Sequence, residues 1–112
     1  MADHLKFYIN GKWVESLGSE TIEVINPSNE TVIGSISAGT KEDIDVAVEA
    51  AKEAFQTFGF SSKEERIELL ENIISEYEKR SEDLAKIISE EMGAPLWLSN
   101  VAQVTSGLSH FK

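Results

Sequence analysis

Side chains that could perform catalysis are scarce in this sequence. It contains two histidines, His4 and His110, and no cysteine. Neither histidine has a serine or carboxylate at a spacing that suggests a catalytic triad or a pair of metal ligands, so we expect ordinary structural or solvated roles, with His4 in a frayed terminus. Without cysteine, the chain has no thiol nucleophile, thiolate metal ligand or disulfide. We therefore assign no catalytic residue within it.

Acidic residues are abundant, but their spacing predicts a solvated helix face. Glu64, Glu68 and Glu71 recur at helical spacing beside Lys63 and Arg66, as on exposed helices with mixed charges. No aspartate-rich loop of the EF-hand type is present, so we reject a calcium module. The glycines are isolated and form no phosphate-binding loop, so the chain by itself is not expected to hold a dinucleotide.

Composition bounds the remaining function classes. The chain has 112 residues, 41% of them hydrophobic, which is enough for a core. Its 10 basic and 20 acidic residues leave a net charge of −10, which opposes binding to nucleic acid and to anionic membranes. No leader peptide and no membrane-spanning run is apparent in the sequence. We expect a cytoplasmic protein with no nucleic-acid or membrane partner.

The elements that would position any site change type near residue 39. In the first part, Asn10-Gly11 separates two short apolar segments and predicts a hairpin with a type I′ turn. A second strand pair is expected over residues 21–25 and 31–36, joined by a turn at Asn26-Pro27. Gly39 ends this region. Residues 1–39 are therefore predicted to form a β-hairpin region.

Residues 40–112 are predicted to form a helical region. Thr40 is expected to cap the first of two amphipathic helices, with Asp43 as an acid in its first turn, and Ser62 with Glu65 forms a capping box before the second. Ser81 is expected to cap a third helix. Glycines at positions 59 and 93 are expected to end the first and third helices, and the segment from residue 96 to 111 is expected to be helical.

The last predicted helix leaves apolar surface without cover. Its apolar positions would form one face for which the rest of the chain has little surface to spare: Leu98, Val101, Val104, Leu108 and Phe111. Two hairpins are also marginal in water unless further strands or helices cover them. We therefore expect the chain to be incomplete as a domain.

Several short segments together resemble one enzyme family. In chain order they are Tyr8–Val14, Val24–Pro27 running into Val32–Gly34, Thr40–Asp45 with Ala47–Phe55, Glu65-Arg66, and Glu91–Pro95. Their order and spacing resemble the N-terminus of NAD(P)-dependent aldehyde dehydrogenases over essentially the whole chain. The resemblance implies an α+β fragment, with two N-terminal β-hairpins followed by three to four helices, of the larger α/β aldehyde dehydrogenase fold. It would be the N-terminal part of the cofactor-binding domain.

The resemblance also implies the chemistry of a parent enzyme. That enzyme oxidises an aldehyde to a carboxylic acid with NAD or NADP, through a thiohemiacetal and a thioester on a cysteine. The catalytic cysteine, the general base and the cofactor site would all lie outside these 112 residues. The chain is thus expected to be a truncated scaffold, inactive by itself, whose partners are the remainder of the dehydrogenase chain and, in the parent enzyme, the aldehyde and further copies in a homo-oligomer.

Two sets of residues are carried over from the family. The backbone carbonyl of Ile25 and the carboxylate of Glu91 map to ligands of a structural monovalent cation, although Glu91 as plain surface charge is an equal reading. Ser99 and Gln103, one turn apart, map to the early wall of the substrate tunnel. Ala94 replaces a lysine frequent in the family, and we assign it no role.

One alternative of a different class stays open at this point. The chain could be a free-standing acidic α+β protein-interaction module derived from the family. Such a module would bind a partner through the apolar face of its last helix.

Overall fold

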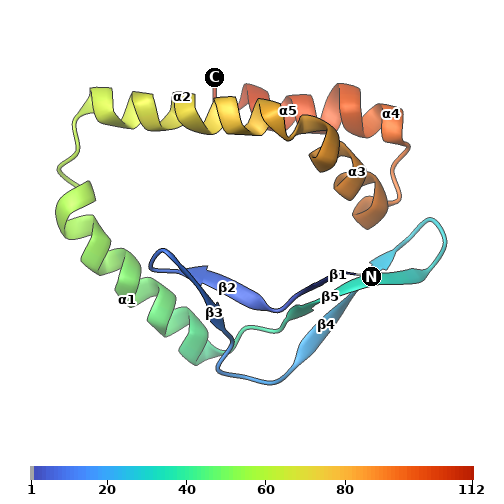
Figure 1. Ribbon diagram of the computed structural model, residues 1–112, viewed down its shortest axis with the longest axis horizontal. Coiled ribbons are helices and arrows are strands. Elements are labelled where there is room, and N and C mark those ends of the chain that lie inside the picture. Colours follow the sequence, from blue (N-terminus) through green and yellow to red (C-terminus); the bar gives the residue numbers. More distant parts are fainter. Residues whose placement is uncertain (1) are drawn as a thin grey trace. The chain divides into compact units, whose positions relative to one another are not determined.

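The computed structural model describes residues 2–112, and strands precede helices throughout (Figure 1). The expected α+β fragment is confirmed. The strands are β1 (Ala2–His4), β2 (Lys6–Ile9), β3 (Lys12–Glu15), β4 (Thr21–Asn26) and β5 (Thr31–Ser37). The helices are α1 (Lys41–Phe58), α2 (Lys63–Lys79), α3 (Ser81–Met92), α4 (Leu96–Leu98), the π-helical η1 (Ser99–Gln103) and α5 (Val104–Ser109).

The described residues group into two compact units. The first contains the chain up to Ile25 together with Val32–Ser61, so α1 groups with the strands. The second contains Asn26–Thr31 and Ser62–Lys112. The turn between β4 and β5 thus groups with the later helices, whereas the strands on either side of it belong to the first unit.

The first hairpin forms as the sequence predicts. β2 and β3 pair antiparallel, with Tyr8 opposite Trp13, and the rings of this pair lie 5.2 Å apart. Asn10 and Gly11 have φ angles of 51° and 74°, the left-handed values that a type I′ turn requires at both positions. The turn therefore sets the register of the hairpin.

The other sheet contains one strand that the sequence did not reveal. Its order is β1-β5-β4, and β1 runs parallel to β5 with His4 opposite Ile36. The expectation of a frayed terminus is therefore wrong. The hydroxyl of Ser35 donates to the Asp3 carboxylate at 2.8 Å, so side chains as well as backbone hold this strand in place.

Asp43 joins the start of α1 to the loop that follows β3. Its carboxylate accepts hydrogen bonds from the Ser16 hydroxyl (2.7 Å), the Leu17 amide (2.9 Å) and the Thr40 amide (2.9 Å). Thr40 is the predicted N-cap, and both halves of its capping box are present. These bonds, that of Ser16 above all, lower the pKa of Asp43 to about 2.

The second predicted cap is confirmed, and the third is wrong. Ser62 and Glu65 form both halves of a capping box at the start of α2. Ser81, by contrast, makes no N-cap bond, because its hydroxyl donates to the carbonyls of Tyr77 and Glu78 in the last turn of α2. Only Arg80 separates the two helices, so the hydroxyl serves the end of α2 and not the start of α3.

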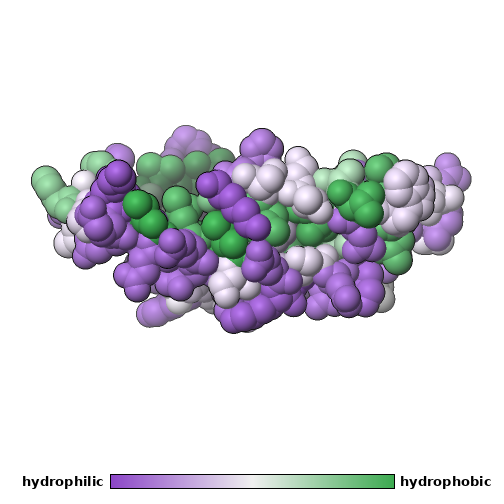
Figure 2. Space-filling view, turned by 90° about the horizontal axis from the view of Figure 1, so that it is seen from above, coloured by the Kyte–Doolittle hydropathy of each residue, from purple (hydrophilic) through white to green (hydrophobic). Residues whose placement is uncertain are grey.

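Most large apolar side chains are exposed. Among residues 3–112, the buried apolar ones are Ala85 and Val104, whereas Trp13, Phe55 and Phe60 are 68%, 68% and 87% exposed. Figure 2 shows apolar side chains lying open between polar ones on the face in view. This chain therefore leaves much apolar surface uncovered. In the same range no helix combines the length and apolarity needed to span a bilayer.

Candidate functional site

The segment after α3 carries two of the residues that the family resemblance singled out, Ser99 and Gln103. Gly93 ends α3 in the left-handed conformation, with φ of 68°, and Pro95 follows as the N-cap of α4. A side chain at Gly93 would be crowded, since an added Cβ would lie 3.0 Å from Pro27 Cγ and 3.1 Å from the Ser28 amide nitrogen. The turn between β4 and β5 thus packs against the point where α3 ends.

A π turn interrupts the helix that follows. η1 spans Ser99–Gln103, and the amide of Val104 donates to the carbonyl of Ser99, five residues earlier. π turns insert one residue into a helix and are frequent at functional sites. The sequence predicted a helix here, but the π turn carried no signal that we could read.

The π turn divides the apolar face expected from the sequence. Val101 is 65% exposed, whereas Val104 is only 4% exposed. A step of three residues covers a smaller angle around the helix axis in the wide π turn than in an α turn. The side chains of Val101 and Val104 therefore point in more different directions than they would on an α-helix. The expectation of one continuous uncovered face is therefore wrong, because Val104 is part of the buried core.

Ser99 and Gln103 lie together, as their spacing predicted. Ser99 is completely buried, and its hydroxyl donates to Oε1 of Gln103 at 2.9 Å. The amide nitrogen of Gln103, a half-buried residue, lies 3.8 Å from the sulfur of Met92. Both side chains are thus held in one hydrogen-bonded pair, and their place in a substrate tunnel stays a prediction.

Tyr77 of α2 contacts the helix directly after this pair. Its hydroxyl donates to the carbonyl of Val104 at 3.0 Å, and its ring lies 6.2 Å from that of Phe111. An added Cβ at Gly107 would lie 2.5 Å from the Tyr77 hydroxyl, so glycine makes room for it. This contact was not expected from the sequence, although an isolated glycine in a helical pattern is a signal of close approach.

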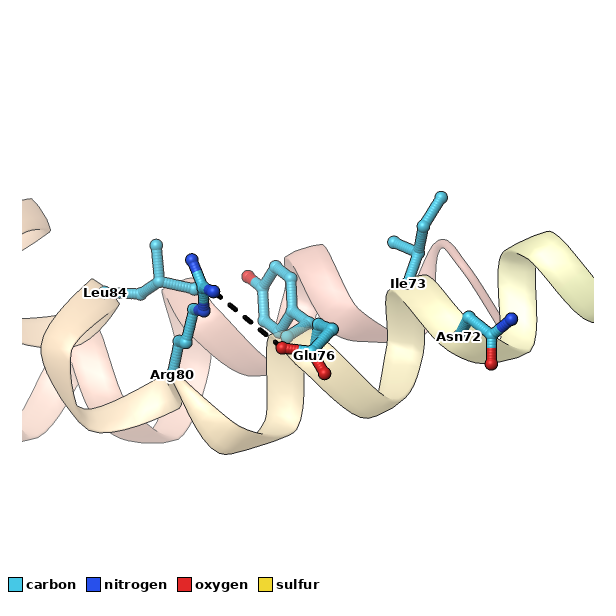
Figure 3. Close-up of a pocket in the computed structure, with 6 residues that line it drawn as sticks. Asn72, Ile73, Glu76, Arg80 and Leu84 are labelled. Atoms are coloured by element: carbon cyan, nitrogen blue, oxygen red, sulfur yellow. Dashed lines mark ion pairs between the residues drawn. The ribbon is translucent and has the colours of Figure 1, made fainter. Parts of the chain in front are cut away.

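A shallow pocket lies beside Tyr77. Its volume is about 420 Å³, and its lining comes from α2 and the start of α3. Figure 3 shows Arg80 reaching toward Glu76, with 3.8 Å between their charged atoms. The lining is formed by Asn72, Ile73, Glu76, Tyr77, Arg80 and Leu84.

The two predicted cation ligands belong to different compact units. Ile25 is 50% exposed, in the first unit, and Glu91 is exposed, in the second. Their oxygen atoms suit a hard cation. Within residues 2–112, no group of three or more histidine, cysteine, aspartate or glutamate side chains is placed to hold a metal ion. The monovalent cation site therefore stays a prediction.

Comparison with known proteins gives a consistent result. The model of the aldehyde dehydrogenase family matches residues 13–112. A Staphylococcus aureus protein (strain bovine RF122 / ET3-1), whose name places it among the aldehyde dehydrogenases, is 51% identical over 111 residues. That alignment covers 99% of this chain and 23% of the relative. The chain therefore spans about a quarter of the length of the curated relatives it matches.

Solved structures agree with this match. The aldehyde dehydrogenase of Bartonella henselae superposes with a TM-score of 0.97 at 46% identity, covering 99% of this chain and 23% of that one. Aldehyde dehydrogenase C of Pseudomonas syringae, a mutant in complex with NAD+ and octanal, gives a TM-score of 0.93 at 37% identity, covering 95% and 22%. On the family match and these two structures, the chain belongs to the aldehyde dehydrogenase family.

Proposed function

We propose that these 112 residues are part of a longer enzyme that oxidises an aldehyde to a carboxylic acid with a nicotinamide cofactor. The observation that carries this proposal is the family match over residues 13–112, in relatives about four times as long. One similar structure, that of the Pseudomonas syringae protein, contains NAD+ and octanal. These relatives favour an enzyme over a free-standing interaction module.

The reacting groups of such an enzyme would come from outside this segment. The chain contains no cysteine, so a thiolate nucleophile would be supplied by the rest of the polypeptide. A bound NAD or NADP would accept the hydride. The 112-residue chain alone is accordingly proposed to be inactive, and its exposed apolar side chains are available to pack against the remainder of the enzyme.

The contribution of these residues is structural support beside the reaction. We assign the segment to the N-terminal part of the cofactor-binding domain, with a β-hairpin region over residues 1–39 and a helical region over 40–112. Gln103, which is half-buried, is proposed to border the route by which the aldehyde enters, and Ser99, which is completely buried, is proposed to hold the Gln103 amide from behind. The fixed geometry of their hydrogen bond supports this role, because a substrate wall is more selective when its polar groups are held in place.

Three further properties are proposed on the resemblance alone. The carbonyl of Ile25 and the carboxylate of Glu91 would hold a monovalent cation, and the donors are of the hard oxygen type that such an ion prefers. The parent enzyme would be a cytoplasmic homo-oligomer.

Two measurements test the proposed function. An antibody against residues 1–112 should detect, in the source cells, a species several times heavier than 12.4 kDa. That species, once purified, should reduce NAD+ or NADP+ when an aldehyde is added, and the 112-residue chain should not. A stable cellular species near 12.4 kDa would contradict the proposal and would favour the interaction module, and turnover by the chain alone would contradict its assignment as a scaffold.

A further inference from the structure

We propose that Tyr77 is a positioning residue for the aldehyde route, acting through the backbone of Val104 on the π turn that carries Gln103. The inference rests on the proposed function, because it concerns the same aldehyde-binding wall. Tyr77 is in α2, and Gln103 is the last residue of η1. The tyrosine thus acts from a different helix on the residue at the wall.

A continuous set of hydrogen bonds connects the two residues. The Tyr77 hydroxyl donates to the Val104 carbonyl at 3.0 Å. The amide of Val104 donates to the carbonyl of Ser99, and the hydroxyl of Ser99 donates to Oε1 of Gln103 at 2.9 Å. Hydrogen bonds therefore hold both the amide and the carbonyl of Val104, the residue at which the π turn ends and α5 begins.

Burial makes this connection rigid. Ser99 is completely buried and Val104 is 4% exposed, so these backbone groups have little access to water as an alternative partner. A buried polar group that loses its partner is costly. The π register is thus stabilised by a contact from α2, and not only by bonds within the turn.

The contact with α5 requires the hydroxyl of Tyr77 and not only its ring. The ring of Tyr77 also lies near that of Phe111, with 6.2 Å between centroids, and phenylalanine would keep that contact. The missing side chain at Gly107 leaves space for the oxygen, since an added Cβ would lie 2.5 Å from it but 3.4 Å from the adjacent ring carbon. Helix α5 therefore carries a recess that matches the tyrosine oxygen.

Loss of the hydroxyl would loosen the π turn. The turn would then be held only by its own bonds, from the Val104 amide to the Ser99 carbonyl and from the Thr105 hydroxyl to the Asn100 carbonyl, so the segment that carries Gln103 could shift. The wall residue would then present its amide in a different direction. The expected consequence is weaker aldehyde binding, with no direct change at the reacting atoms.

The test is Tyr77→Phe in the full-length enzyme, with Tyr8→Phe as the matched control. Tyr8 is 63% exposed and faces Trp13 in the first hairpin. With octanal as the probe, Tyr77→Phe should raise KM by at most about fivefold, the ratio that corresponds to the whole of one ordinary hydrogen bond. Its kcat and its KM for NAD+ should stay within about twofold of the wild type, and the control should change none of the three.

A second variant approaches the same contact from the other helix. Gly107→Ala places a methyl group where the Tyr77 hydroxyl lies, so it should raise the octanal KM with the tyrosine still present. The double variant should show no further rise, because both changes break one contact. This cycle keeps the proposal testable if Tyr77→Phe alone also lowers stability.

The outcomes separate the two proposals. An octanal KM that stays unchanged in Tyr77→Phe, with the wild type active, overturns the positioning role alone. A fall in thermal stability with no change in KM does the same, because it shows a purely structural contact. Absence of any aldehyde oxidation by the wild type overturns the proposed function and this inference together.

Discussion

Replacing Gly93 by alanine should destabilise the second compact unit more than any ordinary glycine-to-alanine change. Gly93 has a φ angle of 68°, where a residue with a Cβ costs about 1–2 kcal/mol. The new Cβ would also lie 3.0 Å from Pro27 Cγ and 3.1 Å from the Ser28 nitrogen. One of these atoms is in a proline ring and the other is in the backbone, so neither moves freely.

The expected loss follows from these two terms. Crowding in a packed site destabilises the folded state by about 1–3 kcal/mol. Alanine also lowers the entropy of the unfolded chain, which stabilises the folded state by about 0.4–1 kcal/mol. The free energy of unfolding should therefore fall by about 1–5 kcal/mol in Gly93→Ala. Gly11 provides the control, because its φ is 74° but nothing lies within 4 Å of an added Cβ. Gly11→Ala should lose only the conformational part.

Urea unfolding of the full-length enzyme that contains these residues, followed by far-ultraviolet circular dichroism, measures both variants. With equal m-values, the difference between them isolates the crowding and should be about 1–3 kcal/mol. Equal losses in the two variants would refute the argument that the Asn26–Thr31 turn packs against the end of α3. A loss in neither would refute the backbone argument as well.

Two further changes have equally direct readouts. The pKa of Asp43 is lowered from 3.8 to about 2, so its stabilising effect should be complete above about pH 4 and lost as the pH falls through about 2. Asp43→Asn should therefore lower the free energy of unfolding at neutral pH and reduce its dependence on pH in the acid range. Asp45→Asn, which removes an exposed ion pair, should do neither. Val104→Ala removes two buried carbons and should lower the free energy of unfolding in urea by about 1.6 kcal/mol. Val101→Ala, at a site 65% exposed, should change it by no more than about 0.5 kcal/mol. Equal losses would show that the π turn does not separate the two valines.

Local signals in the sequence were sufficient for much of the fold. Asn10-Gly11 specifies its turn because both residues tolerate positive φ, and the structure has those angles. The capping boxes at Thr40 and Ser62 specify the starts of α1 and α2 because each satisfies its own helix end. In these places the interacting groups are near neighbours in the chain, so the pattern can be read directly.

The features that were missed depend on partners far away in the sequence. The π turn carries no composition of its own, and its contact with Tyr77 comes from 27 residues earlier than Val104. Ser81 matched the pattern of an N-cap, but its hydroxyl instead donates to the carbonyls of Tyr77 and Glu78 in the last turn of α2. For the candidate site, the spacing of Ser99 and Gln103 predicted their proximity, whereas the complete burial of Ser99 depends on packing that spacing does not encode.

The parallel strand β1 has a consequence for synthesis on the ribosome. Its residues are translated before its partner in β5, and the bonded pair Asp3 and Ser35 is 32 residues apart. Closing a loop of that length costs about 3 kcal/mol of conformational entropy beyond a constant term. A strand of three residues cannot offset this cost before the rest of the sheet has formed. The nascent chain therefore carries an unpaired strand edge until β5 has emerged, and that interval is when a chaperone or a neighbouring nascent chain could pair with it.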